Sequence, residues 1–251
     1  MSKPPLDKAA GPTAEPGRKP AANPATRSRT KRSGSHLTPE SIIEASLRIA
    51  ARGSADAFTV RRLGEELGAD PTAVYRHFRD KDELLLEVAD RTLGEVLDRI
   101  PHGLAWQDRI RALADGSLAV ARKYPAVASA MASRTTRRAN EFRVVELILG
   151  AVTEAGLSGA EAALHYRMVG DSLLALVGQR AAYLLFSAEA RAADESSWKR
   201  EYRLVDPEAF PHITAVATEL AEVTQDQIYA ARVDALITAI ERRVEELRGG
   251  A

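Results

Sequence analysis

The spacing of hydrophobic residues along this chain is that of helices. Apolar positions recur three and four residues apart, and from Ala105 onward no segment alternates apolar and polar residues as a β-strand would. The pattern predicts an all-α fold with a polar loop over 194–206. Capping residues, glycines and prolines divide it into expected helices at about 39–53, 60–67, 71–79, 80–100, 106–123, 125–133, 138–155, 159–193, 207–223 and 225–247.

The segment 58–81 predicts two short helices joined by a three-residue turn. Gly68 can adopt the positive φ that ends the helix over 60–67. Asp70 can then cap the free N–H groups at the start of the second helix, over 71–79. Two short helices about a glycine turn are typical of a helix-turn-helix, in which the second helix enters the major groove of DNA.

The second of these helices has two chemically different sides. At 100° per residue, Val74 and Phe78 share one side and can pack on the first helix. Thr72, Tyr75, Arg76 and Arg79 fall on the other side. A hydroxyl, a phenol and two guanidinium groups are suited to base edges and phosphates, so this side is the expected DNA-contacting side.

Arg61 and Arg62 lie in the first turn of the preceding helix, where positive charge opposes the helix dipole. A helix start that carries arginine is nevertheless a favourable phosphate site. Contact with a DNA phosphate is therefore expected, and two solvated side chains are the alternative.

The stretch 37–90 resembles the DNA-binding domain of the TetR family of bacterial transcriptional regulators, most specifically in the run AVYRHFRDKDELL. The tetracycline repressor has a bulky aromatic residue where this chain has Arg76, which can bind guanine, so a different operator is expected. His77 lies at the edge of this side, with a packing role as the alternative. The resemblance implies operator contacts by Arg61, Pro71, Thr72, Tyr75, Arg76, His77 and Lys81.

The resemblance also implies a division of the chain into a helix-turn-helix domain over 36–82 and a larger helical domain for ligand binding and dimerisation over 83–251. The C-terminal run DQIYAARVDALITAIERRV is similar, more loosely, to the tetracycline-repressor branch. The last helix places Tyr229, Val233, Ile237 and Ile240 on one stripe. With the long helix from 159 it could form a four-helix bundle with a second copy, giving a homodimer, or it could fill the core of one chain.

A small-molecule effector is the other partner that the resemblance implies. Each residue named below as a candidate for binding the effector could instead be a core residue, a satisfied polar group or a loop anchor. The tetracycline repressor, which this chain resembles, uses a histidine after its fifth helix to hold a metal chelated by the drug. This chain has no histidine between His102 and His165, so a drug chelated to a metal is a poor candidate. No metal site or cofactor is expected. The candidate ligand-binding residues are Trp106, Met131, Phe142, His165, Met168, Gln179 and Trp198.

Charge is uneven in this chain of 251 residues. Residues 1–35 carry eight Lys and Arg against two acidic residues, a net charge of +6, and since the whole sums to zero the remainder carries −6. This basic, proline-rich tail is expected to be disordered, and either to follow DNA phosphates or to act as an inert solubilising segment.

Cysteine is absent, and no apolar run is long enough to span a membrane or to form a signal peptide. A cytoplasmic protein without membrane contact is expected. The main functional hypothesis is a DNA-binding regulator, most often a repressor in this family, that binds double-stranded operator DNA. The alternatives are an all-helical small-molecule-binding protein or enzyme, disfavoured by the lack of HExxH, DDxxD and cysteine, and a protein-interaction module.

Overall fold

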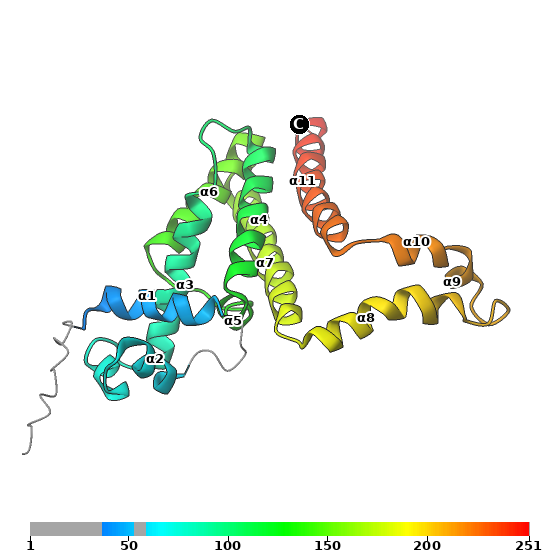
Figure 1. The fold of residues 1–251 in the computed structure, drawn as a ribbon. Coiled ribbons are helices and arrows are strands. Elements are labelled where there is room, and N and C mark those ends of the chain that lie inside the picture. The colour runs from blue at the N-terminus through cyan, green and yellow to red at the C-terminus, as the bar shows by residue number, and fades with distance from the viewer. Residues whose placement is uncertain (1–36, 53–58, 251) are drawn as a thin grey trace, which may run out of the picture. The chain divides into compact units, whose positions relative to one another are not determined.

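The computed structural model describes residues 37–52 and 59–250, and no strand occurs among them (Figure 1). The prediction of an all-α fold is confirmed for this part of the chain. The predicted basic tail, residues 1–35, and the predicted end of the first helix at Gly53 lie outside the described residues.

The first elements are α1 (Pro39–Ala50), α2 (Val60–Leu67) and the 3-10 helix η1 (Pro71–Arg76), and α2 packs on both of the others. Thr38 and Ser41 cap α1 reciprocally, each side-chain oxygen accepting the other residue's N–H at 3.1 and 3.0 Å. Gly68 ends α2 with φ 60, as predicted. Reliable start and stop residues therefore locate these short elements in the sequence.

The second short helix differs from the prediction, because η1 ends at Arg76 and is a 3-10 helix instead of an α-helix to residue 79. Its tight turns close between Ala73 N–H and Asp70 carbonyl at 2.9 Å, and between His77 N–H and Val74 carbonyl at 3.0 Å. Such a short segment forms few α-type bonds, so its buried contacts decide which of the two helical forms is adopted.

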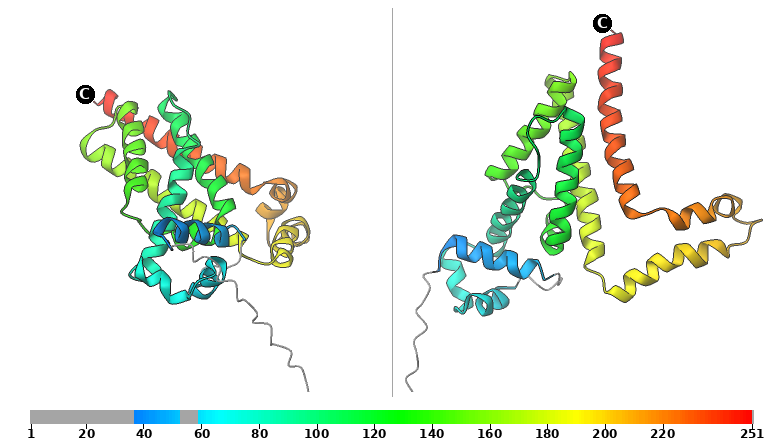
Figure 2. Two further views of the ribbon diagram at one scale, coloured as in Figure 1. Left: turned by 60° about the vertical axis from the view of Figure 1, so that its left-hand side comes forward. Right: turned by 45° about the horizontal axis from the view of Figure 1, so that its top comes forward.

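The next five helices form a bundle. α7 lies against α4, α5 and α6, while α3 lies against α4 and α6 (Figures 1 and 2). Fully buried side chains such as Leu84, Ile110, Leu113 and Ile148 fill its interior. The bundle helices are α3 (Lys81–Leu97), α4 (Trp106–Lys123), α5 (Pro125–Ala130), α6 (Ala139–Ala155) and α7 (Gly159–Leu184).

Three helix starts carry the sequence pattern of a capping box, in which Ser, Thr or Asp is followed three residues later by Glu or Gln, and only one of them forms the complete box. Asp80 accepts the N–H of Glu83 at 2.8 Å, as expected, but the Glu83 carboxylate accepts the N–H of Arg79 at 2.6 Å, one residue before the cap. Ser158 precedes α7 without any side-chain cap bond. The last box is correct, because Thr224 and Gln227 cap the final helix reciprocally.

The region after α7 was the least accurately predicted. The long helix ends at Leu184 instead of 193, and Ser187 caps a new helix that occupies most of the expected loop over 194–206. The single helix expected over 207–223 is divided in two. These elements are α8 (Ala188–Arg200), η2 (Glu201–Arg203), α9 (Pro211–Ala215) and α10 (Ala217–Glu222).

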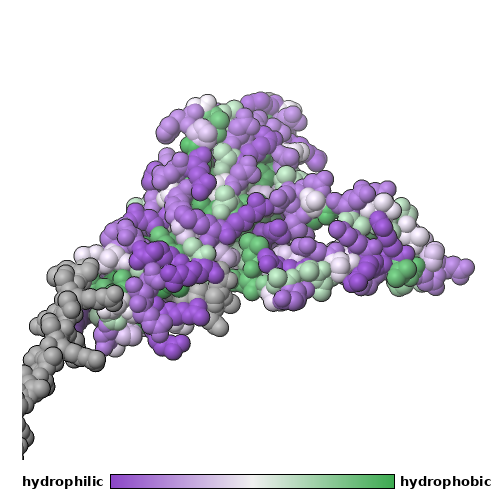
Figure 3. Space-filling model, viewed as in Figure 1, coloured by the Kyte–Doolittle hydropathy of each residue, from purple (hydrophilic) through white to green (hydrophobic). Residues whose placement is uncertain are grey.

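None of these four elements has a buried residue, and they pack mainly on one another (Figures 1 and 2). Figure 3 shows apolar residues scattered among hydrophilic ones in this region. The exposed large apolar side chains here are Phe186, Trp198, Leu204, Phe210, Val216 and Val223.

The final helix, α11 (Gln225–Gly249), packs on α4, α6 and α7. Its stripe of Tyr229, Val233, Ile237 and Ile240 is buried within one chain, and the Tyr229 hydroxyl donates to the Ala114 carbonyl at 2.8 Å. The stripe assigned to a dimer seam therefore serves the core of a single chain, which was the alternative interpretation.

Candidate DNA-contacting surface and effector cavity

Residues 71–77, here called the recognition segment, are held by hydrogen bonds at their start and by buried side chains on one side. The Asp70 carboxylate accepts both the N–H of Thr72 at 2.8 Å and its hydroxyl at 2.6 Å. Val74 and, just after the segment, Phe78 are only 2% and 5% exposed. The segment is thus anchored by one buried side, which leaves the opposite side toward solvent.

That opposite side carries the predicted contact residues. Tyr75 is 45% exposed, and Thr72, Arg76 and His77 are also exposed. In a 3-10 helix of three residues per turn, Thr72 and Tyr75 lie one above the other, with Arg76 beside them. Pro71 is half-buried at the start of the segment.

The remaining two predicted contact residues lie on neighbouring helices. Arg61 is exposed on α2, with its guanidinium 4.0 Å from Glu65, and Lys81 is exposed as the first residue of α3. All but Pro71 of the seven are therefore accessible, and their contact with DNA stays a prediction.

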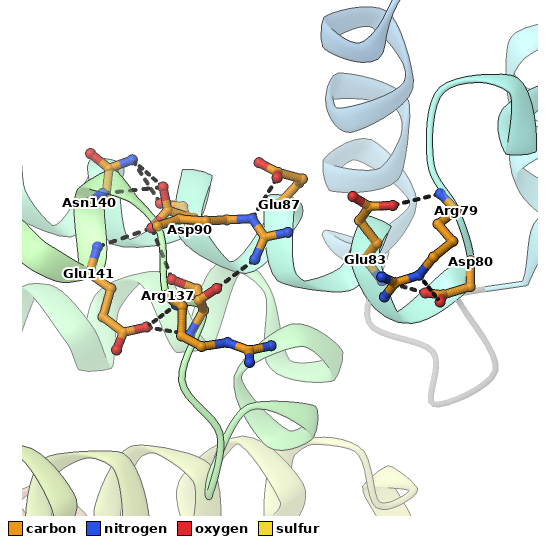
Figure 4. A network of polar contacts seen from close by, with 10 residues as sticks. Arg79, Asp80, Glu83, Glu87, Asp90, Arg137, Asn140 and Glu141 are labelled. Carbon is orange, nitrogen blue, oxygen red and sulfur yellow. Dashed lines mark hydrogen bonds and ion pairs between the residues drawn. The ribbon is translucent and has the colours of Figure 1, made fainter.

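Acidic neighbours of this surface were not anticipated. The hydrogen bonds from Thr72, together with the nearby Arg76, lower the pKa of Asp70, which therefore stays charged. Arg79 donates to Asp80 at 2.9 Å, so its guanidinium is already paired (Figure 4). These carboxylates disfavour phosphate near them and restrict where a DNA backbone can approach.

Asp90, buried on α3, supplies the cap that α6 lacks. Arg138, at the N-cap position of α6, makes no side-chain cap bond. The Asp90 carboxylate instead accepts the N–H groups of Asn140 at 3.2 Å and Glu141 at 3.0 Å, and the Thr136 hydroxyl at 3.1 Å (Figure 4). Because the start of a helix favours negative charge, this contact fixes α6 against α3.

The connection before α6 is tied to the same network. Arg137 has φ 58, a backbone conformation uncommon for a residue other than glycine. The Glu141 carboxylate stabilises this bend by accepting the N–H of Arg137 at 2.8 Å and that of Thr136 (Figure 4). The network that Asp90, Thr136 and Glu141 form, here called the α3–α6 joint, was not predicted from the sequence, although an aspartate in an apolar stripe of α3 was a signal for it.

Two ion pairs extend the joint toward the start of α3. Arg134 donates to both carboxylate oxygens of Asp82, at 2.6 and 2.8 Å, and this pairing lowers the pKa of Asp82. Arg138 pairs with Glu87. The contacts join the connection between α5 and α6 to the helix that begins at Lys81.

We expect Asp90→Asn to lower the free energy of unfolding by about 1–2 kcal/mol, because the variant loses the charge at the start of α6 and directs an amide donor toward other donors. Urea unfolding measures the change. Asp98→Asn, the same substitution at an exposed site just after the C-terminal end of α3, is the control. Equal stability of the two variants would show that the cap contributes nothing.

A cavity lies among α3, α4, α5, α6 and α7, with a volume of about 1090 Å³ that includes its opening to solvent. The wall is mostly aliphatic. Its polar residues are Thr92, Ser117, Arg134, Thr135, Thr136, Glu141, Tyr166, Arg167 and Asp171, so part of the α3–α6 joint also lines the cavity.

Of the seven residues predicted to bind a ligand, Met131 lines this cavity. Trp106 and Met168 are half-buried and pack against the hydrophobic core. His165 is buried, with Nδ1 hydrogen-bonded to the Glu161 carbonyl at 2.8 Å. Trp106, Met168 and His165 thus have the structural roles that were given as alternatives, as core residues or a satisfied polar group. None of the three lies on the cavity wall.

The other three predicted ligand residues lie at the surface. Phe142 is 61% exposed, and Gln179 is exposed and accepts a hydrogen bond from Arg232 at 3.4 Å. Trp198 stacks on Tyr202 with ring centroids 4.2 Å apart. The polar wall residues were not predicted from the sequence, because four helices and the connection between α5 and α6 contribute them and no local pattern marks them.

The described ranges hold no cluster of three or more His, Cys, Asp or Glu side chains arranged for a metal ion. Within the same residues, no helix combines the length and apolar character that crossing a membrane requires.

Two family models match the chain. The model of bacterial regulatory proteins of the tetR family matches residues 42–88, which include α2 and the recognition segment. The model of the tetracyclin repressor-like C-terminal domain matches residues 101–242, more than half of the chain.

Individual proteins agree with these matches. An HTH-type transcriptional regulator of Saccharopolyspora erythraea is 28% identical over 55% of this chain and 57% of its own length. The HTH-type transcriptional repressor Rv1353c of Mycobacterium tuberculosis is 33% identical over 33% of each chain. The matched region thus spans between a third and just over half of these relatives. Apo ActR of Streptomyces coelicolor, 19% identical, has the same fold, with a TM-score of 0.72 over 84% of this chain and 98% of its own.

Proposed function

The chain belongs to the tetR family of bacterial regulatory proteins, and from that membership we propose that it is a sequence-specific DNA-binding regulator which a small molecule releases from its operator. Repression is the proposed mode, because relatives such as the Mycobacterium tuberculosis protein are named repressors. No enzymatic role is assigned to it. A DNA target implies action in the cytoplasm.

The observation that carries this proposal is the exposed side of the recognition segment. Tyr75 and Arg76 extend into solvent while Val74 fixes the segment from beneath. Arginine binds guanine through two hydrogen bonds in the major groove, and exposed polar side chains on a rigid short helix can read base edges.

A homodimer completes the proposal. A helix-turn-helix reader contacts two half-sites about 34–36 Å apart, which requires two recognition segments. The helices α8–α10 favour association, because their exposed apolar side chains gain little burial within one chain. Light scattering on the purified protein measures the mass.

The cavity is the proposed effector site, and the joint between α3 and α6 is the proposed route to DNA. Arg134, Thr136 and Glu141 line the cavity and also hold α3 through Asp82 and Asp90. An effector that fits only one arrangement of this joint would shift the equilibrium toward that arrangement, to the extent set by its difference in affinity for the two. The shift would move α3 and, with it, the recognition segment that precedes it. ActR, which shares the fold, has been crystallised with actinorhodin.

Selection of duplexes from a random pool by the purified chain tests the proposal. We expect enrichment of one palindromic sequence, and binding that weakens steeply with salt. Lys81→Ala should weaken binding to all duplexes alike and reduce the salt slope by about one for each bound subunit, because Lys81 is proposed to contact phosphate. If the protein enriched no sequence, the proposal of sequence-specific DNA binding would be wrong, and the protein would be a small-molecule-binding protein without a DNA role.

A further inference from the structure

If the cavity is the effector site proposed above, the chemistry of its wall narrows the class of effector. Leu93, Val96 and Val127 are among the aliphatic residues that make up most of the wall. Gly170 leaves further room, since a Cβ at that position would lie 3.8 Å from Cε2 of Tyr166, an ordinary contact distance. An apolar molecule therefore gains free energy by leaving water for this site.

The charged groups at the wall are already paired. Arg167 lies 2.9 Å from Asp171, and Arg134 bonds to both oxygens of Asp82. Glu141 accepts two backbone N–H groups. An anionic ligand would find no unpaired arginine here and would have to compete with Asp171 or Asp82, in addition to losing its own hydration.

Most hydroxyl groups of the wall are also satisfied from within the chain. The hydroxyl of Thr92 donates to the Ala89 carbonyl at 2.7 Å, and that of Ser117 donates to the Leu113 carbonyl at 2.7 Å. Thr136 donates to Asp90 in the joint described above. These groups gain little by turning toward a ligand.

Tyr166 is different. Its phenol forms no hydrogen bond with the part of the chain that the structure describes, and the residue is half-buried at the wall. Burial raises the pKa of this phenol, so the proton remains available for donation at neutral pH. Thr135 is the other lining hydroxyl without such a bond, and it is exposed to water.

We propose that the effector is a mostly apolar molecule without an anionic group, with a carbonyl or ether oxygen that accepts a hydrogen bond from Tyr166. The paired arginines exclude an anion from the favoured class, the aliphatic wall selects for apolar bulk, and the phenol selects for an acceptor oxygen.

Charge selectivity is tested with two fluorescent probes that share a ring skeleton. N-phenyl-naphthylamine is uncharged, and anilinonaphthalene sulfonate adds one negative group. The full chain should bind the uncharged probe at least about 10-fold more tightly, as expected for burying a charge without a partner. Gly170→Leu, which directs a side chain into the cavity, should abolish the binding of both probes. It should remain folded, because leucine suits a helix interior.

The hydrogen bond is tested with Prodan, an uncharged naphthyl ketone whose emission moves to longer wavelength when its carbonyl accepts a hydrogen bond. Tyr166→Phe should weaken Prodan binding about 2- to 12-fold, the range for one net hydrogen bond, and should shift the bound emission to shorter wavelength. The loss for N-phenyl-naphthylamine, which has no acceptor oxygen, should be smaller.

Each contrary result overturns a named part of the inference. Equal affinity for the sulfonate would remove the charge selectivity, and unchanged Prodan emission in Tyr166→Phe would remove the hydrogen bond. Probe binding that Gly170→Leu leaves intact, or no probe binding at all, would reject the cavity as this site. A chain that binds the probes as expected but enriches no duplex would retain the ligand class and lose the proposed regulatory function.

Discussion

Replacing Tyr75 and Arg76 together by alanine is expected to reduce the affinity for the selected operator roughly 100-fold or more, because a good base contact is worth about 1–3 kcal/mol. Both side chains are exposed, so the substitution leaves the buried anchors Val74 and Phe78 untouched. The variant should therefore keep the helical content and unfolding midpoint of the original protein. Gel shifts with the selected and a scrambled duplex measure the loss.

The control is Arg242→Ala, which removes the same positive charge from an exposed position on α11. It should bind the operator as the original protein does, which separates base contact from a general loss of positive charge. Discrimination between the two duplexes should fall in the double variant and persist in the control. If the folded double variant bound the operator with full affinity, the recognition segment would not be the DNA-contacting element.

The second large effect is expected at Gly178, where α7 passes closest to the connection after α5. A Cβ there would overlap the Cβ of Ala132 and lie 3.0 Å from its Cα, which is backbone and cannot rotate away. Gly178→Ala must therefore separate α7 from this connection, at a cost of about 1–3 kcal/mol for overpacking. In a domain of this size each kcal/mol lowers Tm by about 2–4 °C.

Gly170→Ala is the matched control on the same helix. A Cβ at this position faces the cavity and meets Tyr166 only at an ordinary distance. Without a clash, the lower backbone entropy of alanine should stabilise the protein by about 0.5–1 kcal/mol. Calorimetry should thus give opposite signs for two identical substitutions, and a rise in Tm for both would contradict the close approach at Gly178.

The sequence by itself determined the elements whose ends are marked by local chemistry. Thr59, Gly68 and Asp70 fix the helix-turn-helix through caps and a left-handed residue, and each acts on its own neighbours along the chain. The same locality made α2 and α4 predictable to the residue. The exposed side of the recognition segment followed from periodicity, since a buried Val74 leaves Tyr75 outside.

Tertiary structure alone decided the features that join distant segments. Asp90 caps a helix 50 residues away in sequence, and no local pattern specifies that partner. Only one of seven predicted ligand residues, Met131, lines the cavity, because a wall built by five helices depends on how they pack. In the sequence, the stripe on α11 was compatible with either a core or an interface, since periodicity identifies which side is buried but not what covers it. The structure buries this stripe within one chain.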